Sequence, residues 1–180
     1  MKAFVVSVSA RDGHGLGKDV QPSIVLIAGE GVAGDAHRGE MVKHRSRVAK
    51  DPTQPNLRQV HLIHAELLDE VADKGFDVRP GDMGENILTR NIDLLGLSEG
   101  TLLRFPSGAS VMITGLRNPC HQLNGHSEGL MNALLDRADD GNVIRKGGVM
   151  AIVTEGGEVF PGDQIEVQVP ASQHVRLSPV

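Results

Sequence analysis

Short apolar runs separated by glycine-rich turns dominate the pattern along the chain. Most of the runs are rich in valine and isoleucine, which favours β-strands over helices. Strong turn signals such as Pro80-Gly81-Asp82 and Pro161-Gly162-Asp163 stand between them. The pattern predicts strands over residues 3–9, 23–28, 59–64, 86–95, 101–105, 110–115, 149–154 and 164–169.

Two segments have the spacing of an amphipathic helix instead. Residues 66–72 carry leucine and valine on one face and end before Gly75. Residues 127–138 begin at Ser127, a candidate N-cap, and continue with a stripe of leucine and methionine. Many short strands with so few helices favour a barrel or a sandwich over a doubly wound sheet. We therefore expect a mainly β fold.

The length of 180 residues fits a single domain. We expect this domain to span residues 1–169, followed by a loosely held polar tail over residues 170–180. No apolar run approaches the roughly 20 residues that a membrane span needs. One cysteine cannot form an internal disulfide, which fits a reducing compartment. The sequence thus predicts a cytoplasmic protein without membrane association.

Composition narrows the range of partners. The chain has no Trp or Tyr, only four Phe, and a net charge of −5. Nucleic-acid binding by base stacking needs aromatic platforms, and a basic surface field is what attracts the phosphates. A nucleic-acid partner is therefore not expected.

Residues 38–58 depart from this acidic average. The segment contains prolines that favour a loop, and His37 and His44 lie nearby. Its two negative side chains are outnumbered by six positive ones: Arg38, Lys43, Arg45, Arg47, Lys50 and Arg58. Two interpretations stay open: a solvated surface loop, or an arm that covers a site for an anionic ligand.

The single cysteine, Cys120, follows the strand predicted at 110–115. Arg117 and His121 can place positive charge close to its sulfur, which favours the thiolate. A thiolate is both a nucleophile and a ligand for soft metals. Pro119 restricts the backbone and would aim the sulfur reproducibly. The alternative is a buried structural cysteine, since free cysteine is among the most buried residue types.

Two glycine-rich segments carry further candidate residues. In residues 31–39, Asp35 could orient His37, which could bind an anion or transfer a proton. In residues 80–87, Glu85 and Asn86 enter a predicted strand and would point to opposite sides of it, so only one of them needs to face a site. Structural turns would explain both segments equally well.

Weaker signals come from two other places. Arg145 and the backbone at Gly147 could bind a phosphate, although the segment has no Walker pattern. His61 and His64 are three residues apart and would face opposite sides of a strand. Without paired cysteines or a His-Glu-x-x-His sequence, a structural zinc site is not expected there.

Taken in chain order, these segments resemble one family. The matching segments are Gly34-Asp35-Ala36-His37-Arg38-Gly39, Val60-His61-Leu62-Ile63, Gly81-Asp82-Met83-Gly84-Glu85-Asn86-Ile87, Arg117-Asn118-Pro119-Cys120, and the Gly147-Gly148 strand followed by Gly162-Asp163. Their order and spacing are similar to those of the MOSC domain, found at the C-terminus of molybdenum-cofactor sulfurases. The resemblance covers about residues 5–167, and the small stand-alone bacterial members are closest in size.

The resemblance implies a β-barrel-like fold with a few peripheral helices. It also implies a role with molybdenum cofactor or in sulfur transfer, with the cysteine at the Cys120 position as metal ligand or sulfur carrier. Relatives of this kind use the cofactor to reduce N-hydroxylated compounds.

We therefore expect a small molybdenum-cofactor reductase in which Cys120 binds the metal, with His37 and Asp35 as further catalytic residues. The anionic pterin cofactor would be held by a set of polar and cationic positions: Arg117, Asn86, Glu85, Arg38, Arg145 and Gly147. Such an enzyme requires a separate electron-donating reductase as partner. Two alternatives stay open: a sulfur carrier with a persulfide on Cys120, loaded by a cysteine desulfurase, and a cofactor-binding module without turnover.

Overall fold

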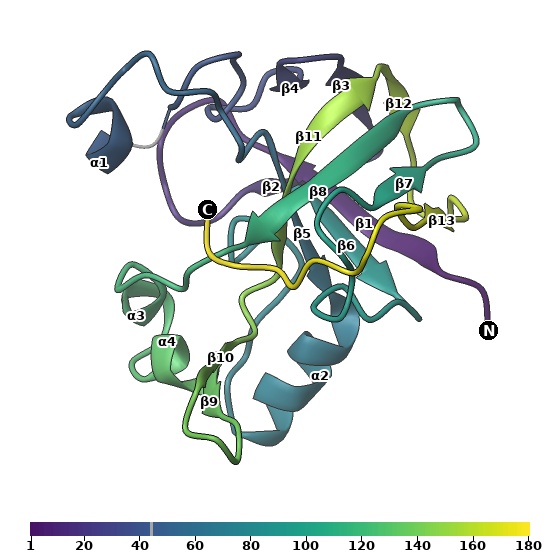
Figure 1. The fold of residues 1–180 in the computed structure, drawn as a ribbon. Coiled ribbons are helices and arrows are strands. Elements are labelled where there is room, and N and C mark those ends of the chain that lie inside the picture. Colours follow the sequence, from purple (N-terminus) through teal and green to yellow (C-terminus); the bar gives the residue numbers. More distant parts are fainter. Residues whose placement is uncertain (44) are drawn as a thin grey trace.

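An eight-stranded sheet forms the centre of the computed structural model, which describes residues 1–43 and 45–180 (Figure 1). The strand order is β13-β7-β8-β11-β5-β6-β1-β2. All neighbours are antiparallel except β5 and β6. The strands are β1 (Phe4–Ala10), β2 (Asp19–Gln21), β5 (Val60–His64), β6 (Ile87–Arg90), β7 (Leu102–Arg104), β8 (Ser110–Leu116), β11 (Val149–Glu155) and β13 (Glu166–Gln168).

The central strands are buried on both faces, which explains their nearly continuous apolar sequences. In β5 the first four residues are all buried, and in β11 the first three. A second sheet, in which β3 (Ile24–Ile27) lies between β4 (Gly31–Val32) and β12 (Gly157–Val159), packs on this core. All eight predicted strands are confirmed at least in part.

Helix α2 (Ala65–Asp73) connects β5 to β6 and confirms the helix predicted at 66–72. Parallel strands need a crossover connection, and this helix provides it. Its buried residues Ala65, Leu67 and Val71 form a second apolar cluster with Leu123 and Leu130. The helix thereby fixes the segment that follows β8 against the lower part of the sheet.

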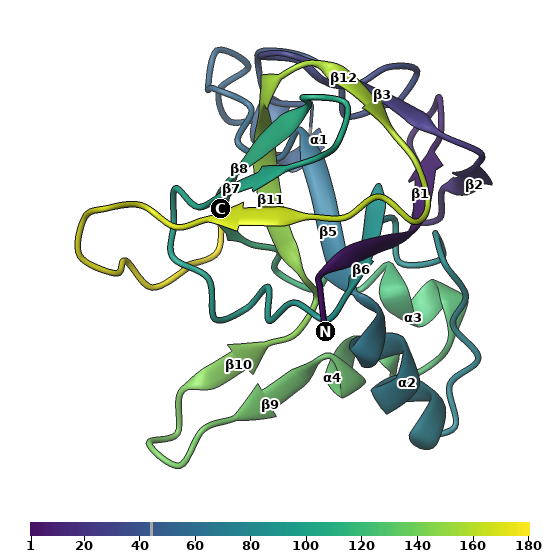
Figure 2. The ribbon, with the colours of Figure 1, turned by 90° about the vertical axis from the view of Figure 1, so that its right-hand side faces the viewer.

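The helix predicted over residues 127–138 is confirmed only over the four residues of α4 (Leu130–Ala133). Another short helix, α3 (Leu123–His126), precedes the predicted range, and the chain enters β9 (Leu135–Arg137) directly after α4 and Leu134. Ser127 is extended and Gly129 is left-handed with φ 85°, so the helix cannot run through them. Strand β9 pairs with β10 (Val143–Arg145), and this ribbon projects from the body in Figure 2.

The mainly β class is confirmed, but a closed barrel is not. The edge strands β13 and β2 do not pair with each other. The closest approach to closure is a set of three backbone hydrogen bonds that join residues 3–5 to residues 162–165, just before β13: Val5 N to Asp163 O, Gly162 N to Val5 O and Ile165 N to Ala3 O. These bonds bring β1 close to the chain that leads into β13, and β13 itself pairs with β7. The sheet is therefore curled, but its edge strands do not pair and it is not a closed barrel.

The tail over residues 170–180, expected to be loosely held, makes specific contacts. Leu177 is buried, the Ser98 Oγ accepts a hydrogen bond from Val175 N, and Leu116 N donates to Ser178 O. Within the described residues, every helix is too short or too polar to cross a membrane.

Candidate functional site

A cleft of about 720 Å³ opens on the side of the molecule where α1 (Arg45–Val48) and α3 lie (Figure 1). Its walls come mainly from residues 14–18, 37–58, 83–86 and 117–122. Among the lining residues that the structure describes, none is acidic and five are cationic: Lys18, Arg47, Lys50, Arg58 and Arg117. In a chain with a net charge of −5, this is a local concentration of positive charge.

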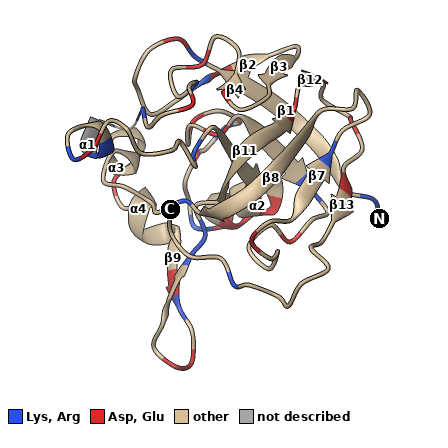
Figure 3. Cartoon of the chain, turned by 45° about the horizontal axis from the view of Figure 1, so that its top comes forward, with Lys and Arg blue, Asp and Glu red and all other residues tan. Residues whose placement is uncertain are grey.

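Part of that charge comes from the positively charged segment at residues 38–58, here called the basic loop. Its side chains reach the cleft from α1 and from the residues around it. Figure 3 shows the positive residues on α1. Arg47, Lys50 and Arg58 line the cleft, whereas Lys43 does not. His44, which the sequence placed near this loop, lies outside the described residues.

The half-buried Cys120 lies in the wall opposite this loop. Strand β8 ends at Leu116, and Arg117 N still donates a hydrogen bond to Gly148 O beside β11 (3.0 Å). Pro119 is buried, and the Cys120 carbonyl accepts the hydrogen bond from Leu123 N (3.1 Å) where α3 begins. The thiol itself is hydrogen-bonded only weakly, to Gln122 Oε1 at 3.7 Å. The backbone is therefore fixed on both sides of an accessible sulfur.

Arg58 and Arg117 carry buried N–H groups without a hydrogen-bond partner in the described part of the chain. These groups are Nε of Arg58 and Nη1 of Arg117. Burial, together with the charges of Arg47 and Arg117, lowers the pKa of Arg58 to about 10, while Cys120 acts in the opposite direction. Burial also lowers the pKa of Arg117, and Cys120 and Glu85 again act in the opposite direction. An unsatisfied buried donor costs about 1–3 kcal/mol, so an anion that accepts from both would relieve a real penalty.

Asp35 lies behind the cleft at the centre of a buried hydrogen-bond network. Lys18 Nζ lies 3.0 Å from each of its oxygens, and Asn86 Nδ2 donates to Oδ1 (3.2 Å). His37 donates its backbone N–H to Oδ2 (3.1 Å) and places Nδ1 3.5 Å from it. Burial alone would raise the pKa of Asp35, but the His37 hydrogen bond and the Lys18 charge outweigh it and hold that pKa well below its usual range. Asp35 is thus an anion that orients Lys18 and His37.

Asn86 and Glu85, which precede β6, differ in their relation to the cleft. Asn86 lines the cleft, but its amide is already used: Oδ1 accepts from His61 N, and Nδ2 donates to Ser9 O as well as to Asp35. Glu85 is fully buried and outside the cleft lining; its Oε1 accepts from Gly81 N, while Oε2 has no partner in the described residues. Burial raises the pKa of Glu85 to about 7. Both residues therefore position the site from within.

Three other predicted positions lie outside the cleft lining. Arg38 is engaged by Glu30, with Nη2 2.6 Å from Oε2. Arg145, in β10, donates from Nε to Asn118 Oδ1 (2.9 Å) and so supports the segment that carries Cys120. The Gly147 carbonyl lies 2.8 Å from His61 Nε2, and the space beside its Cα is filled by Pro119 and Arg117.

Lys18 and His61 are among the lining residues that the sequence did not single out as site residues. Lys18 lies in a loop without a recognisable motif, and its role follows only from its contact with Asp35. His61 was considered only as a zinc ligand; here it is buried, and burial together with the Arg117 charge lowers its pKa well below the usual value. No pattern in the sequence predicted that this histidine would be buried and neutral at the base of a cationic cleft.

The chain is similar in sequence to known proteins. A family model described as the MOSC domain matches residues 36–166. YuaD of Bacillus subtilis, whose name proposes a role in metal-sulfur cluster biosynthesis, is 30% identical over 145 residues, which is 76% of each chain.

Solved structures agree with the fold. The crystal structure of B. subtilis YuaD has a TM-score of 0.76 at 26% identity and covers 94% of this chain and 97% of its own. YiiM from Geobacillus stearothermophilus (TM-score 0.66, 14% identity, 97% and 79% coverage) and YiiM from Escherichia coli (0.64, 20%, 97% and 73%) share the fold.

Proposed function

The chain belongs to the MOSC domain family, and from this premise we propose that its cleft binds the molybdenum cofactor with Cys120 as a ligand to the metal. The observation that carries the proposal is a half-buried thiol in a cleft lined by five Lys and Arg side chains and no acidic residue in the described part of the chain. The cofactor is an anionic pterin with a phosphate and an oxo-metal centre. A soft thiolate suits the metal, and cations suit the phosphate.

The residues present fit such a group. The cleft volume of about 720 Å³ lies within the range of cofactor sites. The partnerless N–H groups of Arg58 and Arg117 would be occupied by phosphate or oxo oxygens. The described residues contain no cluster of three or more His, Cys, Asp or Glu that could bind a metal. Cys120 would therefore be a single protein ligand to a metal that the pterin already holds.

The proposed reaction is the reduction of an N-hydroxylated compound. When bound, the cofactor would supply the two-electron chemistry for breaking the N–O bond. His37, in the cleft wall and held by Asp35, would deliver one of the two protons that the reduction consumes, because a carboxylate behind a histidine fixes its ring; the second would come from solvent. An electron-donating reductase is the proposed partner.

The test is to purify the protein from a molybdenum-replete host and to measure bound molybdenum and pterin. We expect both in the wild type, and we expect metal to be lost from Cys120→Ser. The matched control is Ser172→Cys in a Cys120→Ala background, which keeps one thiol but moves it to the exposed C-terminal segment. Wild-type protein without metal or pterin would contradict the proposal.

A second candidate function is a sulfur carrier in which Cys120 bears a persulfide. It is favoured by the relationship to YuaD, whose name concerns metal-sulfur cluster biosynthesis. Cys120 is the chain's single cysteine and is not sealed in the core, so a sulfur donor can reach it. Incubation with a cysteine desulfurase and its substrate should add the mass of one sulfur atom to the wild type and none to Cys120→Ala. A wild type that stays unmodified would exclude this role.

A further inference from the structure

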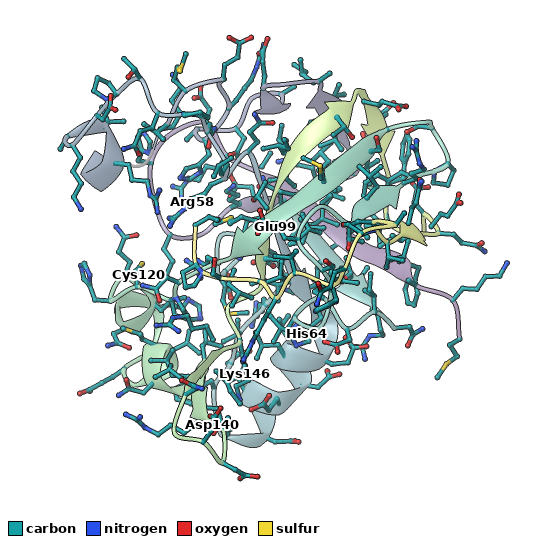
Figure 4. All side chains as sticks on the ribbon, viewed as in Figure 1. Arg58, His64, Glu99, Cys120, Asp140 and Lys146 are labelled. Carbon is teal, nitrogen blue, oxygen red and sulfur yellow. The ribbon has the colours of Figure 1, made fainter. Side chains whose placement is uncertain are left out.

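A cysteine that only received sulfur from a partner protein would not need buried hydrogen-bond donors around it, yet Cys120 shares its cleft with such donors. Two arginines, Arg58 and Arg117, line the same cleft as Cys120, and each leaves one buried N–H without a partner in the described residues. Figure 4 shows Arg58 and Cys120 on the same side of the molecule. The site therefore offers a sulfur nucleophile next to hydrogen-bond donors for an oxyanion.

A ligand that satisfies both features must carry charged oxygens and an electrophilic sulfur at once. Phosphate and sulfate have the oxygens, but neither contains a sulfur that a thiolate can displace. A thiosulfonate-type anion, of which inorganic thiosulfate is the smallest, has a sulfonate head and a terminal sulfane sulfur. Its sulfonate oxygens can accept from the two arginines while its outer sulfur meets Cys120.

We propose that the cleft is a thiosulfate-type sulfurtransferase site, in which Arg58 and Arg117 hold the sulfonate group and Cys120 accepts the sulfane sulfur. The proposal rests on the sulfur-carrier function of Cys120 and names the small-molecule donor for it. The cleft favours such a donor because Lys18, Arg47 and Lys50 add positive charge for a dianion and no acidic residue is among its described lining residues.

The reaction balances without an external oxidant or reductant. Cys120, having released its proton to solvent, attacks the sulfane sulfur as a thiolate, and a new S–S bond forms. The S–S bond of thiosulfate breaks, and its electron pair leaves with sulfite. An acceptor nucleophile, such as cyanide or a small thiol, then takes the outer sulfur, and that bond's electron pair returns to Cys120. With cyanide, the sum is thiosulfate plus cyanide giving sulfite plus thiocyanate.

The arginines are placed to lower the barrier of the first step. During the transfer, negative charge moves from the Cys120 sulfur onto the sulfonate oxygens of the leaving sulfite. Donors that are already oriented toward those oxygens stabilise this charge without reorganisation. The partnerless Arg58 Nε and Arg117 Nη1 are candidates for these donors.

The test uses the purified full chain with inorganic thiosulfate and cyanide, and measures thiocyanate formation. We expect turnover by the wild type and none by Cys120→Ala, with no rescue by the additional Ser172→Cys change. Arg58→Gln and Arg117→Gln should each lower kcat/KM for thiosulfate by about 10- to 100-fold, as expected for loss of a hydrogen bond to a charged group. Arg79→Gln, at an exposed position outside the cleft, is the matched control and should leave the rate unchanged.

A measurement on the wild type alone guards against variants that fail to fold. Sulfite should inhibit competitively with cyanide, because both react with the persulfide on Cys120, and thiosulfate without acceptor should add one sulfur atom to Cys120 by intact mass. If the desulfurase loads Cys120 but thiosulfate does not, the donor proposal is wrong while the carrier role stands. If neither donor loads Cys120, both are wrong. Thiocyanate formation that survives Cys120→Ala would also overturn the assignment.

Discussion

Replacing Glu85 with glutamine removes a buried carboxyl group that titrates differently in the folded and unfolded chain. In the folded protein, burial raises the pKa of Glu85 from 4.5 to about 7, against the Gly81 hydrogen bond and the charges of Arg117 and Lys18. Between these two values the folded protein holds a proton that the unfolded chain has lost. The stabilisation that Glu85 gives through this proton is therefore greatest at low pH and is lost as the pH rises through 7.

The size of the effect follows from the two pKa values. Integrating the proton linkage between 4.5 and about 7 gives a loss of about 2–3 kcal/mol of unfolding free energy from pH 5 to pH 8. In Glu85→Gln this loss is absent, while the side-chain oxygen can still accept from Gly81 N. The amide that replaces the partnerless Oε2 costs the same at every pH, so it does not change the slope.

Urea unfolding of both proteins at pH 5, 6, 7 and 8 measures this difference. Relative to the wild type, the stability of Glu85→Gln should rise by about 2–3 kcal/mol across the series. Other titrating groups contribute equally to both proteins and cancel in the difference. Glu166→Gln, at an exposed position, is the matched control for the chemical change. Parallel stability curves for Glu85→Gln and the wild type would refute the reasoning.

Three further outcomes follow from the packing around the cleft. Gly148→Ala should cost more than about 4 kcal/mol, because φ is 89° and a Cβ would clash with the Leu62 carbonyl oxygen. Gly141→Ala, with a similar φ of 82° in open space, should cost only about 1–2 kcal/mol, as urea unfolding can show. Asn86→Ala should lower the unfolding free energy by about 3 kcal/mol or more, because three buried hydrogen-bond partners lose their contact; an unchanged denaturation midpoint would contradict this. Sulfate should raise the melting temperature of the wild type more than that of Arg117→Gln in a thermal scan, since it would bind only the folded cleft.

The sequence was most informative where a motif sits at the end of a predicted strand. Cys120 and Arg117 come from one segment, His37 and Asn86 from two others, and the structure brings all four to one cleft. Their order along the chain was enough to find them because each lies in a short segment with glycine or proline at fixed positions.

The roles of other cationic residues depend on ion pairs with distant residues, and no local sequence pattern predicts these pairs. Arg38 has the same charge as Arg58, yet Glu30 engages the first, while the second turns a buried N–H group toward no partner among the described residues. Lys18 has no motif around it and enters the site through Asp35. Which cation meets a carboxylate is decided by tertiary contacts between distant segments, so the sequence could supply the candidates but not their assignment.

The helix predicted over residues 127–138 also depended on tertiary contacts that the local sequence does not show. The apolar stripe in residues 127–138 was correctly identified, since Leu130 and Leu134 are buried. The backbone nevertheless breaks at Gly129, where a left-handed residue separates two short helices. The stripe reports burial against α2 rather than a continuous helix, because burial in this cluster outweighs local helix propensity.

The cleft described above is assembled from segments that lie more than a hundred residues apart, between His14 and Gln122. No fragment of the chain contains all of its walls, so no partly folded state can bind the ligand as the native state does. An anion held between the basic loop and the Cys120 segment would act as a removable cross-link, and its binding energy would add directly to the free energy of global unfolding. Without it, Arg58 is a buried cation close to other cations: burial first, and then the charges of Arg47 and Arg117, lower its pKa. Ligand binding in the cleft and folding of the chain are thus coupled equilibria. The amount of folded protein in the cell should therefore rise and fall with the supply of the ligand.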